Sequence, residues 1–496
     1  MRSMNYLIVC FGMLMVMSVA AQTSASDSLP RPAPAKGPLR VHPENPRYFT
    51  DATKTRDASL KAVYLTGSHT WYNLRDSGTI GEPLTHFDYS AYLDLLQSSG
   101  HNLMRMWAWE GGVNKNYCAP LAYRRTGPGT AWDEKPKFNL NQFNQEYFDR
   151  LRARVVAAGQ RGIYVSVMLF QGWSIYDHDY GNPWPRHPFN AANIANGING
   201  DPDGDGQGKD VHTLQVPAIT RLQETYVRKV VDTLNDLDNV LYEVTNETAL
   251  FSQDWQYYIV RYIKSYQAAK PKQHPVGITA FDSGREGSME ALLGSAADWI
   301  SPQNDGASGD YMNDPPPADG RKVIISDTDH LWGVGGDRIW VWKSFTRGLN
   351  PIYMDPLSKP DWVRSSEAEM EGARKAMGDT RRYAERMNPS TSLRAGLAAM
   401  VPRCDLASSK YCLANPGAEY LVYLPADGEV TVDLSAAKGI LQMEWVHVAR
   451  PSWPCFHGLE ARATGTVKPA APVQGGSQCR FQTLFNGDTA LHLGGK

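Results

Sequence analysis

The chain has 496 residues, of which 42% are hydrophobic and 21% are charged, and its formal net charge is -2. This composition excludes a disordered chain. Because there is no dense block of lysine or arginine, it also argues against a nucleic-acid surface and a polybasic membrane anchor. The length exceeds that of one ordinary domain, so we expect two domains.

The N-terminus has the layout of a secretory signal peptide over residues 1–21. Arg2 precedes an apolar stretch over residues 6–19, and small residues follow before Gln22. The apolar stretch is too short to cross a membrane. We therefore expect a secreted or periplasmic protein with no integral membrane segment after signal removal. Residues 22–40, rich in Pro, Ala and Ser, are expected to form a flexible lead-in.

Removal of the signal leaves an odd number of cysteines, so at least one is unpaired in an oxidised chain. Cys404 and Cys412 could staple a hairpin, and Cys455 with Cys479 bracket a loop-rich insert. Cys118 is then the unpaired thiol. The alternative, in which all five are reduced, stays open.

Residues 41–390 alternate apolar strand-like runs with helical patterns. Eight strands are expected, at residues 61–66, 102–107, 162–170, 239–244, 275–279, 297–301, 322–326 and 350–354. Helices are expected at residues 89–98, 146–159, 217–237, 254–268, 338–347 and 366–387. Eight alternating units predict an α/β fold with a closed (β/α)8 TIM barrel. An open doubly wound sheet is disfavoured, since no strand leads into a glycine-rich phosphate loop.

Residues 391–496 change to short strands separated by turn signals, at residues 419–424, 430–434, 441–446 and 490–493. This pattern predicts a small C-terminal antiparallel β-sandwich. Such a module can brace a barrel or hold a polymer, and we favour bracing.

Two of the predicted barrel strands end in acidic residues. The fourth strand is followed by Asn246 and Glu247, and the seventh by Asp327 and Asp329. The C-terminal ends of barrel strands carry the chemistry of this fold, and two carboxylates from two strands are the minimum for cleaving a glycosidic bond. Alternation along the fourth strand points Glu243 into the lower barrel and brings Glu247 out at the rim. Glu247 is the better candidate catalyst.

The run Val-Leu-Tyr-Glu-Val-Thr-Asn246-Glu247 resembles the strand-four signature of the retaining (β/α)8 glycoside hydrolases, a clan that includes family five cellulases and mannanases. In that clan the glutamate of the Asn-Glu pair is the acid/base. Arg105, in the second strand, resembles the arginine that supports the nucleophile. The opening at residues 64–71 is similar to that of the apiosidase-like branch, whose members end in a domain labelled collagen-binding, and residues 420–434 resemble that domain.

The resemblance implies a secreted glycoside hydrolase that uses a two-carboxylate, retaining mechanism on a polysaccharide or oligosaccharide. A departure lies in strand seven, where the clan has a glutamate and this chain has Asp327, with Asp329 as the rival nucleophile. Aspartate is shorter by about 1.5 Å. Retaining enzymes hold their carboxyls about 5–5.5 Å apart and inverting ones about 6.5–9.5 Å, so either outcome stays open. The alternative function is an inactive exported protein that binds carbohydrate or matrix.

A further group of polar and aromatic residues follows strand ends and is expected to line a carbohydrate-binding cleft. These residues are Asn246, Arg105, His69, Trp71, Trp107, Trp109, Gln171, Trp173, His330, Trp332 and Asp355. Asn246 is expected to bond a sugar hydroxyl next to the scissile bond. For each tryptophan, core packing is the alternative. The identity of the sugar and the oligomeric state stay open.

Asp201, Asp203 and Asp205 alternate in the manner of a calcium loop, with Gly206 at the turn. Position twelve is His212 and not a bidentate glutamate, so a full EF-hand is excluded. A structural calcium and a metal-free Asp/Gly turn are the two interpretations. We expect no cofactor to be required. Motifs of zinc proteases, serine hydrolases and P-loop enzymes are missing from the sequence, which disfavours these enzyme classes.

Overall fold

The computed structural model describes residues 33–55, 58–79, 81–111, 116–178, 181–281, 288–304, 309–357, 363, 365–387, 396–448 and 467–494. The expected signal peptide lies outside these residues, as does Cys455. The expected lead-in is described from residue 33, and there it contacts the barrel. The Ala35 N–H donates to the Gly159 carbonyl at 2.8 Å, and Leu39 is fully buried.

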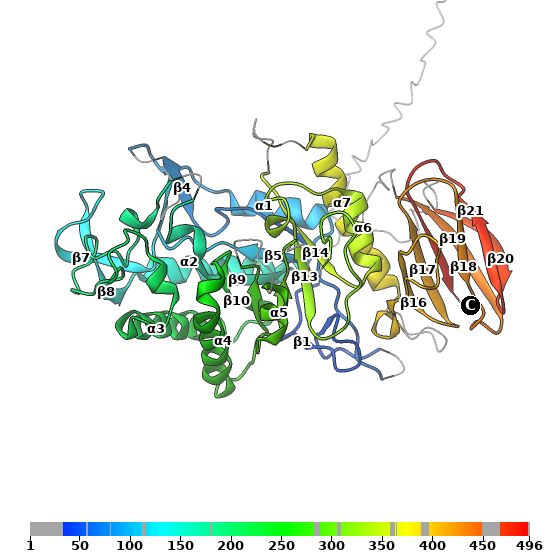
Figure 1. The fold of residues 1–496 in the computed structure, drawn as a ribbon, viewed down its shortest axis with the longest axis horizontal. Coiled ribbons are helices and arrows are strands. Elements are labelled where there is room, and N and C mark those ends of the chain that lie inside the picture. Colours follow the sequence, from blue (N-terminus) through cyan, green and yellow to red (C-terminus); the bar gives the residue numbers. More distant parts are fainter. Residues whose placement is uncertain are drawn as a thin grey trace, which may run out of the picture. The chain divides into compact units, whose positions relative to one another are not determined.

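Eight parallel strands form a closed barrel in chain order (Figure 1). They are β3 (Gly67–His69), β5 (Leu103–Met106), β9 (Tyr164–Gln171), β10 (Val240–Asn246), β11 (Val276–Thr279), β12 (Trp299–Ser301), β13 (Val323–Asp327) and β14 (Asn350–Met354). β14 pairs with β3 and closes the ring. The predicted TIM barrel is confirmed.

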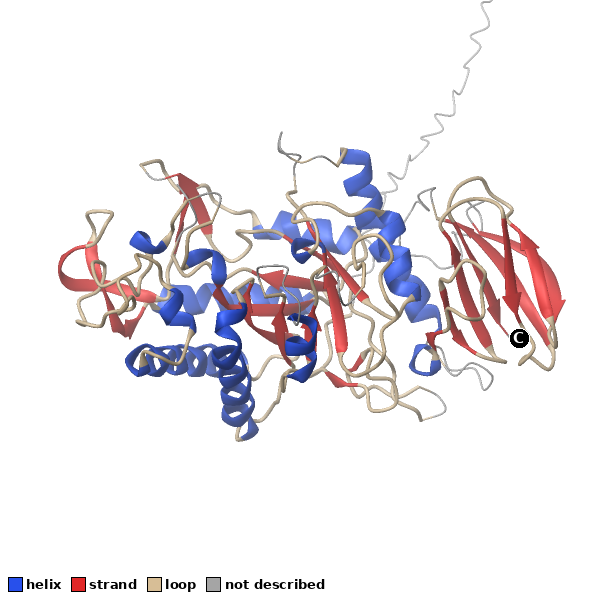
Figure 2. Cartoon of the chain, in the orientation of Figure 1, coloured by secondary structure: helices blue, strands red, loops and turns tan. Residues whose placement is uncertain are grey.

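Helices cover the outer face of the barrel (Figure 2). They are α1 (Tyr89–Ser98), α2 (Gln145–Gln160), α3 (Pro217–Leu234), α4 (Gln253–Ala268), α5 (Ser288–Gly294), α6 (Arg338–Thr346) and α7 (Glu367–Met387). Their apolar faces pack on outward strand residues such as Val167, Val244 and Ile278. The short α5 was not expected. None of the helices in the described part of the chain is long and apolar enough to cross a membrane.

The first barrel strand lies later in the chain than the predicted residues 61–66. The backbone N–H groups of Leu65 and Thr66 donate to the side chains of Asn350 and Asn102, so they are not available to a neighbouring strand. Leu65 instead packs in the apolar cluster inside the lower barrel, with Leu103 and Trp299. A short two-stranded sheet, β1 (Arg40–Val41) with β2 (Phe49–Thr50), precedes it.

Three connections contain structure that was not predicted. Those from β3 to α1 and from β5 to α2 form two antiparallel ribbons, β4 (Asp76–Thr79) with β6 (Asn116–Ala119) and β7 (Tyr123–Thr130) with β8 (Pro136–Phe143). In its described residues, the connection from β9 to α3 contains three 3₁₀ turns, η1 (Gly172–Ser174), η2 (Trp184–Arg186) and η3 (Lys209–His212). The β7–β8 ribbon and this connection share a small apolar core that includes Phe138, Trp184 and Val211.

The C-terminal region is antiparallel, as predicted. One sheet has the order β15 (Val401–Pro402), β16 (Cys412–Asn415), β17 (Glu419–Leu424), β22 (Thr489–Gly494), β19 (Ile440–His447) and β20 (Val467–Gln474). A ribbon of β18 (Glu429–Asp433) and β21 (Gln478–Gln482) packs on it through Val432, Phe481 and Leu491. Tyr423 of the sheet stacks on Trp342 of α6, with ring centroids 5.8 Å apart.

The cysteines differ in part from expectation. Cys404 and Cys412 are both free, so the predicted bridge between them is wrong. The physical reason is that Cys412 points into the core between the sheet and the ribbon, where it packs as an apolar residue. Cys118 is free and buried, as expected. Cys479 is free as well, so its predicted pairing with Cys455, which lies outside the described residues, is wrong.

Gly67 allows β3 to approach β5, because a Cβ at this position would lie 2.0 Å from the Leu103 carbonyl oxygen. Gly67→Ala should therefore destabilise the barrel by about 1–3 kcal/mol or more. The matched control is Gly372→Ala in α7, where an added Cβ meets nothing within 4 Å. That variant should be neutral or gain up to about 1 kcal/mol. Urea unfolding of both measures the difference, and equal stabilities would contradict the proposed close packing.

Candidate active site

The guanidinium of Arg105 lies inside the barrel and contacts four side chains. Two of them come from β10, one from β13 and one from the turn that follows β13. Nε and Nη2 donate to Glu243 at 3.0 and 2.6 Å, and Nη2 also donates to Asn246 at 2.6 Å. Nη1 donates to Asp327 at 2.8 Å and to Asp329 at 3.1 Å. These five residues are called the Arg105 cluster. Burial lowers the pKa of Arg105, but the carboxylates of Glu243 and Asp327 outweigh it and raise the pKa well above the usual value.

Strand alternation explains why these residues meet. Side chains of a strand alternate between the outer and inner faces of the barrel, and Leu103 and Leu241 pack in the inner apolar cluster. Arg105 and Glu243 are each two residues further along the same strands, so they point inward one layer higher. Asp327 follows Ile325 in the same way. The expectation that Glu243 points into the lower barrel missed that it is the main partner of Arg105.

Asp327 is fully buried, and both of its carboxylate oxygens are occupied. Oδ1 accepts from His69 Nε2 at 2.9 Å and from the Asp329 N–H at 2.9 Å. Oδ2 accepts from Arg105. Burial alone would raise the pKa of Asp327, but the His69 ring and the Arg105 guanidinium hold it well below the usual range. Asp327 is therefore a fixed buried anion.

The tautomer of His69 follows from its partners. Trp107 Nε1, which can only donate, donates to His69 Nδ1 at 2.8 Å. Nδ1 must therefore be an acceptor, and the ring proton lies on Nε2, where it is donated to Asp327. The indole of Trp107 orients the histidine for this bond. Both rings are buried.

Asp329 lies one short turn beyond Asp327, in η5 (Thr328–His330). The turn lifts its carboxyl out of the barrel interior, and the residue is partly exposed. Burial raises its pKa, Arg105 opposes this, and the neighbouring Asp327 adds to it, with a result of about 6. One guanidinium faces three carboxyl groups here, so the outermost of them is held least firmly in its charged form.

Glu247 follows β10 directly and is partly exposed. Its carboxylate accepts from Trp173 Nε1 at 2.7 Å and from Asn246 Nδ2 at 3.3 Å. The backbone of Glu247 has a positive φ of 45°, a conformation that is strained for a residue with a side chain and is typical of functional sites. Gly172 permits it, because a Cβ there would lie 2.3 Å from the Glu247 carbonyl oxygen.

Glu247 and Asp329 face each other. One carboxylate oxygen of each, with a ring nitrogen of His330, forms a group whose atoms all lie within 4.8 Å of one another. Such a group could hold a metal ion, but both nitrogens of His330 are in hydrogen bonds, at 3.0 Å to Asn246 Oδ1 and 2.8 Å to Ser301 Oγ. Burial and the Arg105 charge lower the pKa of His330 to about 3, so the ring is neutral. The side chains that remain available to a ligand are therefore the carboxyl groups of Glu247 and Asp329.

Asn246 is fully buried, and its amide is used inside the protein. Oδ1 accepts from Arg105 and His330, and Nδ2 donates to Glu247 and, at 3.4 Å, to Gln171. Asn246 therefore links the Arg105 cluster to Glu247. The expected bond to a sugar hydroxyl has only the Nδ2 group available to it.

The remaining residues predicted for the cleft divide by exposure. Trp71, Trp173 and Trp332 are partly exposed, whereas Trp107, Trp109 and Gln171 are buried. Trp107 and Trp109 stack on each other with centroids 5.3 Å apart. Trp107 and Trp109 are therefore packing residues beneath the surface of the candidate site.

Asp355 is also buried, and each of its carboxylate oxygens accepts from Arg374 of α7 at 2.6 Å. This pair joins α7 to the end of β14. Because both of its oxygens are bonded to Arg374, Asp355 has a structural role in this arrangement.

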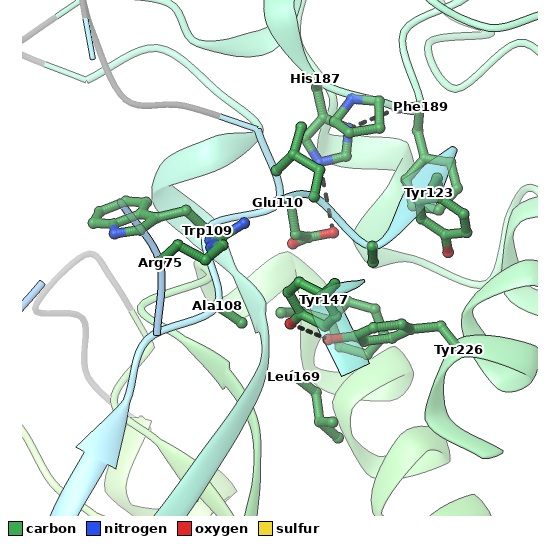
Figure 3. Close-up of a pocket in the computed structure, with 14 residues that line it drawn as sticks. Arg75, Ala108, Trp109, Glu110, Tyr123, Tyr147, Leu169, His187, Phe189 and Tyr226 are labelled. Carbon is green, nitrogen blue, oxygen red and sulfur yellow. Dashed lines mark hydrogen bonds and ion pairs between the residues drawn. The ribbon is translucent and has the colours of Figure 1, made fainter. Parts of the chain in front are cut away.

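One polar network was missed by the sequence interpretation. Glu110 accepts from the Gln171 N–H at 2.8 Å and from His212 Nε2 at 3.1 Å, and His187 lies 3.5 Å away. Burial raises the pKa of Glu110, but His212 and His187 outweigh it and lower the pKa to about 2. Figure 3 shows Glu110 and His187 beside a small cavity that Arg75 also lines. Glu110, eight residues before Cys118, carries no motif that could have identified it.

Comparison with known proteins places this geometry in a fold class. A family model described as "Domain of unknown function (DUF6298)" matches residues 105–285. No curated protein matches the chain. A solved structure described as "Glycoside hydrolase" is similar at a TM-score of 0.56 and 12% identity, covering 92% of this chain and 97% of that chain. A glycoside hydrolase family 5 structure from Bacteroides vulgatus ATCC 8482 has the same TM-score and identity and covers 92% of both chains. The chain shares its fold with glycoside hydrolases.

The Arg105 cluster gives a stability prediction. Arg105→Met leaves Glu243 and Asp327 buried without their cation, so we expect a loss of about 3–5 kcal/mol of unfolding free energy. Arg152→Met is the control, because the exposed pair with Asp236 at 2.7 Å is expected to contribute about 1 kcal/mol or less. Chemical denaturation measures both. A loss in Arg105→Met no larger than in the control would show that the cluster is not a buried electrostatic unit.

Proposed function

We propose that the protein is an exported glycoside hydrolase that cleaves a polysaccharide or oligosaccharide with retention of anomeric configuration. The observation that carries the proposal is the pair of carboxyl groups of Glu247 and Asp329, whose nearest oxygens lie within 4.8 Å at the ends of β10 and β13. A short separation of this order is that of retaining enzymes, since inverting enzymes need room for a water molecule. The signal-like N-terminus supports export.

Glu247 is assigned as the general acid/base. Its carboxyl accepts hydrogen bonds from Trp173 and Asn246, which fix its position. In the first step it protonates the leaving-group oxygen as the glycosidic C–O bond breaks. In the second step it takes a proton from the water that attacks the anomeric carbon.

Asp329 is assigned as the nucleophile, in place of the Asp327 favoured by the sequence. Asp329 is the one that faces Glu247 and reaches the barrel mouth, whereas both oxygens of Asp327 are occupied and the residue is fully buried. Asp327 instead accepts the Asp329 N–H and shares Arg105 with it. It is a positioning residue for the nucleophile.

The roles can be separated with aryl glycosides that carry a good leaving group. Glu247→Ala should lose rate by about 10²- to 10⁴-fold on poor leaving groups. On a good leaving group the glycosyl-enzyme still forms, and added azide should release a glycosyl azide of retained configuration. Asp329→Ala should form no covalent intermediate, and azide attacking in its place should give the inverted product. NMR of the products distinguishes the two.

Asp327→Asn is the matched variant for these experiments. It should lower activity and stability without azide rescue, because no cavity opens at the anomeric carbon. Rescue by azide in an Asp327→Ala variant, together with an active Asp329→Asn, would reverse the assignment. Wild-type enzyme releasing an inverted sugar would overturn retention while leaving hydrolysis in place.

The pH dependence provides another test. Asp329 must be ionised to attack, and its pKa is about 6, so kcat/KM should fall tenfold per pH unit as the pH drops below about 6. The pKa of Asp327 is held below its usual range, so a reaction that depended on Asp327 would keep its rate down to about pH 4. The profile of kcat/KM between pH 4 and 8 separates the two. A flat profile from pH 4 to 6 would count against Asp329.

A further inference from the structure

The connection between β9 and α3 contains an acidic loop, defined here as residues 199–210. Carboxylate oxygens of Asp201, Asp203 and Asp210 lie within 4.8 Å of one another. Asp205 is not in this group, because its carboxylate accepts from the Gln207 N–H at 2.7 Å and pairs with Lys209 at 3.4 Å. The sequence pattern pointed to the loop, but it named Asp205 where the fold brings in Asp210.

Two carboxylates of the group accept backbone N–H groups of the loop, Asp201 Oδ2 from Gly206 and Asp203 Oδ1 from Asp205, each at 3.1 Å, but other oxygens of the group have no such donor. Asp210 is only 7% exposed, and among the described residues its carboxylate makes no hydrogen bond or ion pair. Oδ1 of Asp201 is likewise buried without a hydrogen-bond partner in the part of the chain that the structure describes. An unpaired buried charge costs several kcal/mol unless a counter-ion is bound.

The charges of the group also repel one another. Carboxylate oxygens of three aspartates lie within 4.8 Å of one another, so like charges are held close together. The one basic side chain bonded within the acidic loop, Lys209, pairs with Asp205 and not with the group. A cation placed between the three carboxylates would offset their charge repulsion and would contact the oxygens that have no hydrogen-bond donor.

We propose that Asp201, Asp203 and Asp210 bind a calcium ion. All available ligands are oxygens, which selects a hard cation, and a loop that can adjust its geometry and add backbone carbonyls suits Ca²⁺ better than the smaller Mg²⁺. The turns that bring the aspartates together occur at Gly204 and Gly206, both with positive φ. Counted from Asp201, Asp210 lies at position ten of the loop, two residues before His212.

The proposed ion has a structural consequence at the active site. Asp210 belongs to η3, and two residues later His212 bonds both Glu110 at 3.1 Å and Thr248 Oγ1 at 3.1 Å. Thr248 directly follows Glu247. The ion would therefore fix the segment that supports the backbone of the proposed acid/base.

The test uses the full mature chain, treated with EDTA and dialysed, and CaCl₂ as the probe. Calorimetric titration should give saturable binding at a stoichiometry near one, and calcium should raise the melting temperature of the wild type. Asp210→Asn should weaken the affinity at least about tenfold, because the ligand charge decreases. Asp205→Asn, in the same loop, is the matched control and should bind as the wild type does.

Absence of binding heat together with a melting temperature indifferent to EDTA and calcium would overturn the proposal and leave a metal-free turn. Equal weakening by Asp205→Asn and Asp210→Asn would overturn the ligand assignment. MgCl₂ binding as tightly as CaCl₂ would overturn the choice of ion. Because none of these measurements uses a glycoside, their failure is independent of the proposed hydrolase activity.

Discussion

The guanidinium of Arg105 is the interaction on which the centre of this barrel depends. A buried cation has no stable place in a protein interior unless carboxylates surround it, and buried carboxylates equally need a cation. Glu243, from β10, and Asp327, from β13, provide the charge. Since each is bonded to the same side chain, the three strands are held in one register. The positions of the side chains at the barrel mouth therefore depend on Arg105, Glu243 and Asp327, which lie one layer deeper in the barrel.

The balance of one positive charge against three carboxyl groups also gives Asp327 and Asp329 different pKa values. One positive charge is shared by three carboxyl groups, so they cannot all be equally stabilised as anions. Asp327 has two further N–H donors and stays ionised, whereas Asp329 shares Arg105 with it and has a raised pKa. The distinction depends on η5, which turns the chain immediately after β13. Two residues of the same type, two positions apart, are thereby given different chemistry.

The sequence predicts the regular elements well because period and burial are local properties. Seven of the eight strands begin within two residues of the predicted positions, and α1 matches at both ends. It fails where long-range contacts decide. Leu65 looks like a strand residue, but Asn350 takes its N–H; Asp327 looks like the rim acid, but a 3₁₀ turn brings Asp329 forward. Glu110 becomes part of the site only because the chain folds His212 onto it.

The long connection from β9 to α3 adds a second level of organisation to the barrel. Barrel strands fix Arg105 and its partners, but the strained backbone of Glu247 is held by residues of this connection, Gly172 and Tyr176 among them. A loop without a sheet or long helix has little backbone bonding of its own, so it needs a compact core or a bound ion to keep one conformation. The apolar cluster around Trp184 supplies the first, and the acidic loop packs against it through Gly200 and Gly208. The position of Glu247 relative to Asp329 thus depends on the β9–α3 connection, whose conformation is stabilised by contacts outside the barrel.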